Sequence, residues 1–162
     1  MFNFLKTMNP FVKYSNYCLF IHRVELINLE MSQELWDKLY VAFSCEVVQT
    51  KKLIFRDISF NRNNMKQAAA ISAKISNVIF DNIDVERKKE NFWNCMLYSI
   101  DGGICGIDKL QLDFLQIYDE HILGLSKLIT RIKQVELSNF QMDNGQWDML
   151  MKELKKRGNY IQ

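Results

Sequence analysis

The segment LIFRDISF, residues 53–60, contains the spacing that decides the fold, with large apolar side chains at offsets 0, 2, 5 and 7 from Leu53. The same spacing recurs four more times and fills all twenty positions. The set is Val24, Leu26, Leu29, Met31; Leu53, Phe55, Ile58, Phe60; Val78, Phe80, Ile83, Val85; Leu110, Leu112, Leu115, Ile117; and Val135, Leu137, Phe140, Met142. The blocks begin 25 to 32 residues apart, and a period in this range predicts a stacked array of supersecondary units.

Each block predicts a strand followed by a turn and a helix. Offsets 0 and 2 alternate as in a strand that buries one face. About a dozen or more residues with helical periodicity follow, which is long enough for a crossover between parallel strands. After the first block, for example, Ser32 opens a segment in which Leu35, Leu39 and Phe43 recur at helical spacing. We therefore predict an α/β fold whose stacked units line one surface with strands and the other with helices.

The five blocks resemble the consensus of leucine-rich repeats, in the longer helical form similar to ribonuclease inhibitor. The resemblance covers about residues 22–157 and implies a right-handed solenoid of about five repeats, with a parallel sheet on the concave face and helices on the convex face. The family usually has Asn or Cys at offset 5, where this chain has Leu29, Ile58, Ile83, Leu115 and Phe140. We expect the residues at offset 4 to replace that polar ladder. They are Asn28, Asp57, Asn82 and Asn139, with Phe114 as the exception.

Residues 1–23 differ from the rest, because several basic side chains precede the first acidic residue, Glu25. We divide the chain into this N-terminal segment, five repeats at 24–158 and a tail at 159–162. The N-terminal segment is predicted to cap the end of the stack, which would otherwise expose core side chains. The alternative is a mitochondrial targeting segment, since such segments are basic, amphipathic and poor in acidic residues.

The composition is that of an ordinary globular domain, with 25% charged and 48% hydrophobic residues. The net charge of +2 gives no indication of a nucleic-acid or membrane surface. No apolar run reaches the roughly 18 residues of a membrane span. The cysteines, which form no CxxC pair or zinc spacing, are Cys18, Cys45, Cys95 and Cys105. Reduced thiols and the absence of an N-x-S/T sequon favour an intracellular, cytosolic protein.

The sequence contains no catalytic constellation, so we predict no enzyme activity, no cofactor and no metal. Neither GxSxG nor HExxH occurs, and His22 and His121 lie far apart, one in the N-terminal segment and one in the fourth repeat. We expect His121, in the first turn of a helix, to be solvated. The glycine-rich segment 101–106 precedes a strand and lacks the GK[ST] ending of a phosphate loop, so we interpret it as a turn. Asp81 and Asp113 share one column of the sheet surface, but no nucleophile or cofactor motif lies nearby.

The candidate binding face is formed by offsets −1, 1 and 3, which point away from the predicted core. Ile27, Ile54 and Ile79 are expected to cluster on the first three strands. The charged residues at their rim are Arg23, Lys52, Arg56 and Asp81. An apolar centre with a charged rim is the anatomy of a protein interface. The alternative is that the three isoleucines are simply strand formers or are covered by the N-terminal segment.

These observations predict a non-catalytic protein–protein interaction module, an adaptor or scaffold. It would bind another protein or a multi-subunit complex through the concave strand face or through an open end of the solenoid. The alternative is a structural or accessory subunit of a large organellar, mitochondrial assembly that docks through residues 1–23. Neither a nucleic-acid partner nor a membrane span is expected.

Overall fold

The structure, a computed structural model, describes residues 19–44, 48–85, 92–102 and 106–156. Its main sheet has five parallel strands in the order β1-β2-β4-β6-β7. They are β1 (Leu19–Ile27), β2 (Val48–Arg56), β4 (Asn77–Asp81), β6 (Lys109–Asp113) and β7 (Gln134–Ser138). A second, two-stranded parallel sheet pairs β3 (Ser59–Phe60) with β5 (Asp84–Val85). The predicted α/β class with a parallel sheet is confirmed.

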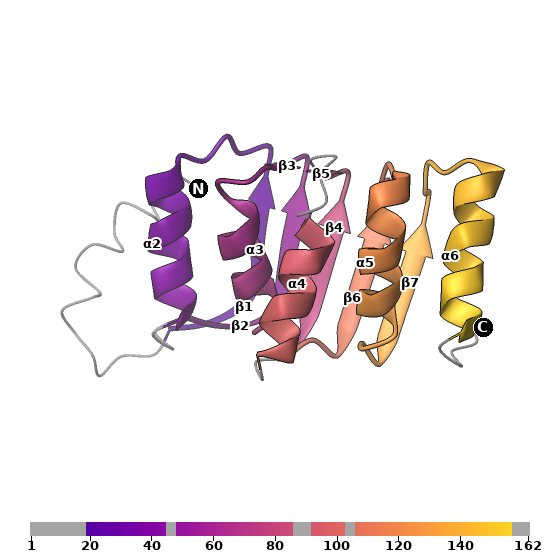
Figure 1. Ribbon diagram of the computed structural model, residues 1–162. Coiled ribbons are helices and arrows are strands. Elements are labelled where there is room, and N and C mark those ends of the chain that lie inside the picture. The colour runs from indigo at the N-terminus through magenta and orange to yellow at the C-terminus, as the bar shows by residue number, and fades with distance from the viewer. Residues whose placement is uncertain (1–18, 45–47, 86–91, 103–105, 157–162) are drawn as a thin grey trace.

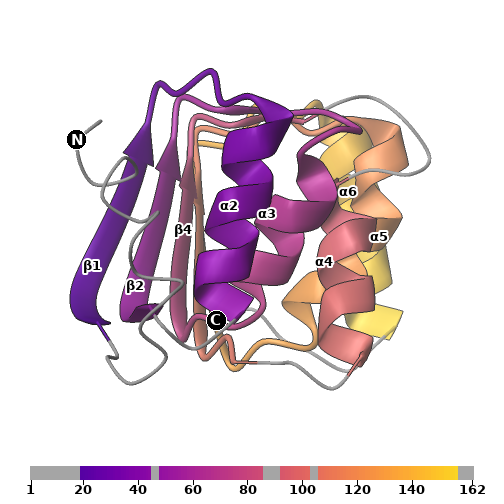
Figure 2. The ribbon, with the colours of Figure 1, turned by 90° about the vertical axis from the view of Figure 1, so that its left-hand side faces the viewer.

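The helices lie on one face of the main sheet (Figure 2). They are α2 (Gln33–Ser44), α3 (Met65–Ser72), α4 (Phe92–Asp101), α5 (Asp119–Ile129) and α6 (Asn144–Lys156). Each helix packs against the next in the row, from α2 to α6 (Figure 1). Ser32 opens α2 as predicted, because its carbonyl accepts hydrogen bonds from the backbone N–H groups of Leu35 and Trp36. No helix of the described residues lies on the opposite, outer face of the sheet (Figure 2).

Equal offsets of the sequence pattern lie side by side in the sheet. At offset 0, Val24 pairs with Leu53, Leu53 with Val78, Val78 with Leu110 and Leu110 with Val135. The same register continues through offset 2 along all five strands. Because side chains alternate between the two faces of a strand, this register directs offsets 0 and 2 toward the helices in every strand.

All five strands of the main sheet end at offset 3, because the residue at offset 4 turns the chain. All five offset-4 residues have positive φ angles between 46° and 54°: Asn28, Asp57, Asn82, Phe114 and Asn139. Asn and Asp tolerate this left-handed conformation better than most residues. The turn breaks the strict inward–outward alternation, so offsets 5 and 7 point inward again, as the burial of Ile58 and Phe60 illustrates.

The offset-4 residues form two hydrogen-bonded ladders between neighbouring strands. Their backbone N–H groups donate to the offset-3 carbonyl of the next strand, at 2.9 Å from Asn28 to Arg56 and 3.0 Å from Asn82 to Asp113. The side-chain ladder is partial. Asn82 Nδ2 donates to Asp57 Oδ1 at 2.6 Å, and Asn139 Nδ2 donates to Asp113 Oδ1 at 2.8 Å.

The core between sheet and helices is rich in aromatic rings. Phe55 and Phe80, paired in register at offset 2, stack with ring centroids 5.3 Å apart. Phe60 stacks on Phe92 of α4 at 4.5 Å, and Phe80 meets Trp93 edge-to-face at 6.1 Å. Stacked and edge-to-face pairs add about 0.5–1.5 kcal/mol each beyond their buried area. The rings therefore tie neighbouring layers of strand and helix together.

Two details differ from expectation. Strand β1 begins at Leu19, so residues 19–23 extend the first strand; residues 1–18 lie outside the described part, as do the tail 159–162 and the cysteines at 18, 45 and 105. The expectation of a solvated His121 is wrong, because its side chain is fully buried. It lies on the same face of α5 as Leu125 and Leu128, one and two turns further along, and that face packs inward.

None of the described helices is both long and apolar enough to cross a membrane.

Candidate functional site

The structure brings all seven residues of the predicted binding face together on β1, β2 and β4. Strand pairing aligns them in three rows, one for each offset. The rows are Arg23 with Lys52, Ile54 with Ile79, and Ile27 with Arg56 and Asp81. We call these seven residues the outer patch. It lies on the sheet face opposite the helices, because the intervening positions Leu53 and Phe55 belong to the core.

The centre of the outer patch is less accessible than the sequence predicts. Ile54 is only 2% exposed, although it is not part of the core cluster between sheet and helices. Ile27 and Ile79 are half-buried. The accessible atoms therefore come largely from the rim, where the side chains of Arg23 and Arg56 are 49% and 42% exposed. A partner of this face would meet charged groups first and apolar groups second.

Ion pairs organise the rim of the outer patch. Arg56 Nε donates to Asp81 Oδ2 at 2.6 Å, and Arg23 pairs with Glu25 on its own strand. The hydrogen bond to Asp81, followed by the charge of that carboxylate, raises the pKa of Arg56 above its ordinary value. Lys52, the register partner of Arg23, is half-buried. With three cations and two carboxylates among Arg23, Glu25, Lys52, Arg56 and Asp81, the region keeps a small positive excess.

The two carboxylates of the predicted Asp81–Asp113 column are register partners on β4 and β6. They are directed to different partners, since Asp81 binds Arg56 and Asp113 accepts a hydrogen bond from Asn139. Both therefore hold neighbouring layers together. Within the described residues, no group of three or more His, Cys, Asp or Glu side chains is arranged to hold a metal ion.

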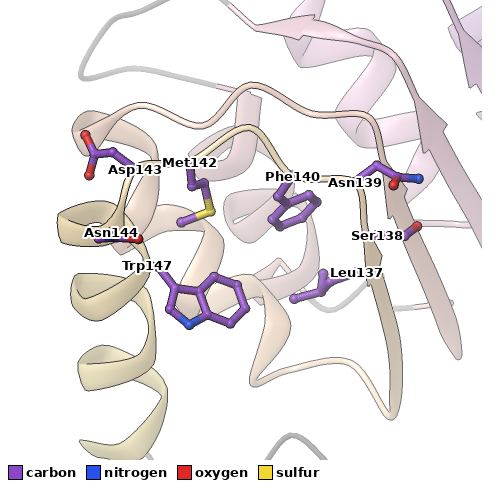
Figure 3. Close-up of a pocket in the computed structure, with 8 residues that line it drawn as sticks. All are labelled: Leu137, Ser138, Asn139, Phe140, Met142, Asp143, Asn144 and Trp147. Carbon is purple, nitrogen blue, oxygen red and sulfur yellow. The ribbon is translucent and has the colours of Figure 1, made fainter.

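Two hollows lie away from the outer patch, and the sequence reasoning missed both. One, of about 400 Å³, follows the turns beyond the strand ends and includes Asp57, Asp84 and Phe114. The other, of about 310 Å³, lies at the C-terminal end of the stack and includes Leu137, Phe140, Met142 and Trp147 (Figure 3). A signal for the second hollow was present in the sequence, because Leu137, Phe140 and Met142 of its lining stand at offsets 2, 5 and 7 of the fifth block.

Together these features define a class of protein, an α/β domain whose described part has a five-stranded parallel main sheet with helices on one face and no helix on the other. Comparison with protein-family models, with curated protein sequences and with solved structures gives no significant match. The resemblance to leucine-rich repeats therefore stays a prediction from the sequence pattern.

Proposed function

We propose that this chain is a leucine-rich-repeat-like solenoid that binds another protein and carries out no chemistry of its own. The repeat assignment is supported by five blocks of identical apolar spacing whose equal offsets pair in register. It is supported further by the left-handed residue that recurs at offset 4 in every block. In such an array each unit contacts its neighbours, and the strand face is left for a ligand.

The observation that carries the binding proposal is the outer patch. Seven residues from three neighbouring strands form one surface, in which Ile54 is buried, Ile27 and Ile79 are half-buried, and charged side chains stand at the rim. Protein interfaces combine a buried apolar centre with a polar rim that excludes water. The small positive excess of the patch suits a partner surface with excess carboxylates, which would also speed association.

The test is a comparison of two matched double variants as baits in a pull-down read by quantitative mass spectrometry. Lys52→Glu with Ile79→Asp changes the outer patch. Lys66→Glu with Leu123→Asp makes the same chemical changes at exposed positions of α3 and α5. Ile54 is left intact, because an aspartate at a 2% exposed position would test folding instead of binding.

We expect proteins captured by the wild-type chain to be lost with the outer-patch variant and retained by the helix-face variant. Circular dichroism and thermal unfolding of all three proteins establish that both variants are folded. Equal capture by the two folded variants would reject the outer patch as the docking surface.

The alternative function is that of a subunit in a mitochondrial assembly, because residues 1–23 are basic and contain no acidic residue. Its test is a fusion of residues 1–25 to a fluorescent protein. A mitochondrial signal would favour a subunit docked in that compartment, and a diffuse signal would remove this alternative.

A further inference from the structure

The apolar side chains of the last layer, which contains β7, are partly exposed, whereas the side chains at the same offsets of the internal layers are buried. At offset 0, Leu53, Val78 and Leu110 are completely buried, whereas Val135 is half-buried. At offset 2, Phe55, Phe80 and Leu112 are completely buried, whereas Leu137 is half-buried. Phe140 and Met142 repeat this difference at offsets 5 and 7. The side chains are of the same kind throughout, so the difference comes from the absence of a further layer beyond β7 in the described chain.

The backbone at this end has the geometry that accepts another strand. In each of the four preceding layers, the offset-4 N–H donates to the offset-3 carbonyl of the next strand. Asn139 has the same left-handed conformation, with φ of 52°, but in the described chain no strand lies beyond β7. In parallel strands, alternate residues direct their N–H and C=O groups to the same side. Val135 and Leu137 therefore present their backbone groups to the free edge together with Asn139.

A hollow lies beside the free edge of β7. It measures about 310 Å³ and is bounded by β7, the following turn and the start of α6. Figure 3 shows the indole of Trp147 and the side chains of Met142, Phe140 and Leu137 gathered between α6 and β7. Trp147 is 45% exposed. A partly exposed tryptophan beside an unpaired strand edge combines an apolar anchor with backbone hydrogen bonding, which is the arrangement used in strand addition.

We propose that the free edge of β7 binds an extended segment of another polypeptide, in parallel and in the register of the internal layers. The internal interfaces define its chemistry. It carries large apolar side chains at offsets 0, 2, 5 and 7, which cover Val135, Leu137, Phe140 and Met142. It carries asparagine at offset 4, because Asn82 in that place donates to Asp57 of the preceding layer and the oxygen of Asn139 offers the same acceptor. This surface is separate from the outer patch, so the two binding proposals can be tested independently of each other.

The probe is a fluorescein-labelled peptide with the sequence of residues 77–85, NVIFDNIDV, which satisfies the whole pattern. It is titrated onto the full-length chain and followed by fluorescence anisotropy. A control peptide exchanges the residues at positions 80 and 81, which keeps the composition but moves phenylalanine to the other face of the strand. We expect saturable binding of the first peptide and loss of binding for the control.

The protein variants are Trp147→Lys at the edge and Leu123→Lys on α5, both at partly exposed apolar positions. Trp147→Lys is expected to weaken peptide binding about tenfold or more, since a charge replaces an apolar anchor that the peptide covers. Leu123→Lys is expected to leave binding unchanged. Hydrogen exchange of the wild-type protein gives a readout that needs no variant: the peptide should slow exchange at residues 134–139 and leave residues 119–129 unaffected.

Equal binding of both peptides, or exchange protection elsewhere than β7, would overturn the proposal. Analytical ultracentrifugation identifies the competing occupant, a second copy of this chain. Its β1 edge also leaves Val24, Leu29 and Met31 half-buried. Concentration-dependent self-association that Trp147→Lys abolishes, without binding of the peptide, would assign the edge to that copy and refute the peptide partner.

Discussion

Arg56 Nε donates a hydrogen bond to Asp81 Oδ2 at 2.6 Å, and these two residues are also direct register partners across β2 and β4. Both stand at offset 3 of their blocks. The register that buries Leu53 and Val78 on the inner face also brings this ion pair together on the outer face, since a slip of one residue would move every side chain to the opposite face of the sheet. The pair thus links the charge pattern of the outer face to the apolar pattern of the inner face.

A double-mutant cycle on this pair should give a small, salt-sensitive coupling. The variants are Arg56→Ala, Asp81→Ala and the combination, compared by urea unfolding at low and high ionic strength. Half-exposed ion pairs are screened by solvent and salt. The buried apolar side chains at offsets 0 and 2 should therefore contribute far more to stability than this pair does. A large coupling that persists at high salt would show that the pair determines the register.

The two leucines at offset 2 of the last two blocks should respond differently to the same substitution. Leu112→Ala removes a completely buried side chain and should cost about 2–5 kcal/mol of unfolding free energy. Leu137→Ala should cost distinctly less, because its side chain is half-buried at the end of the stack. Chemical denaturation of both variants measures the difference. Equal losses would mean that the last layer is as well packed as the internal ones.

Replacing Phe114 with asparagine should stabilise the protein. Phe114 adopts a φ of 50° at the position where the other four turns have Asn or Asp, and the residue is 52% exposed. Relief of the left-handed strain predicts a gain of about 1 kcal/mol, with little apolar burial lost. The reverse change, Asn82→Phe, should destabilise, since it adds the strain and removes the hydrogen bond to Asp57. Thermal unfolding of both variants tests the pair; a destabilised Phe114→Asn would indicate that the ring contributes to packing.

Gly106 should not tolerate a side chain. A Cβ atom there would lie 2.8 Å from the carbonyl oxygen of Lys74, a backbone atom that cannot move aside easily. Gly106→Ala should therefore cost about 1–3 kcal/mol. Gly102→Ala is the control, because its added Cβ would meet its nearest neighbour at 3.4 Å, an ordinary contact. Unfolding midpoints of the two variants should separate clearly, and coincident midpoints would contradict the prediction.

Glu34, in the first turn of α2, should contribute to the pH dependence of the protein's stability. The hydrogen bond from Lys38, at 2.6 Å, and then the charge of Lys38 lower the pKa of Glu34 below its ordinary value of 4.5. Stability from a lowered carboxylate pKa is present above the unfolded-state pKa and is lost as the pH falls through the folded-state pKa. Glu34→Gln should thus be less stable than the wild type at neutral pH and equally stable in strong acid. Thermal melts across this range check the convergence.

The sequence was sufficient to predict the order, direction and register of the strands. Apolar residues at offsets 0 and 2 determine which side of each strand faces the core, and a crossover of about a dozen residues makes neighbouring strands parallel. At offset 4 the sequence predicted a polar ladder, which the structure forms in part, whereas the left-handed conformation of these residues was found only in the structure. These predicted features depend on the local conformation of the chain, which a short stretch of sequence determines.

Burial was decided by the tertiary structure. Leu112 and Leu137 occupy the same offset and differ in exposure only because a further strand covers the first. Ile54 was expected to be accessible and His121 solvated, yet both are buried. The spacing of residues along a chain specifies the direction of a side chain. Its exposure depends on the layers that pack beyond it, and those layers come from parts of the chain that are distant in sequence.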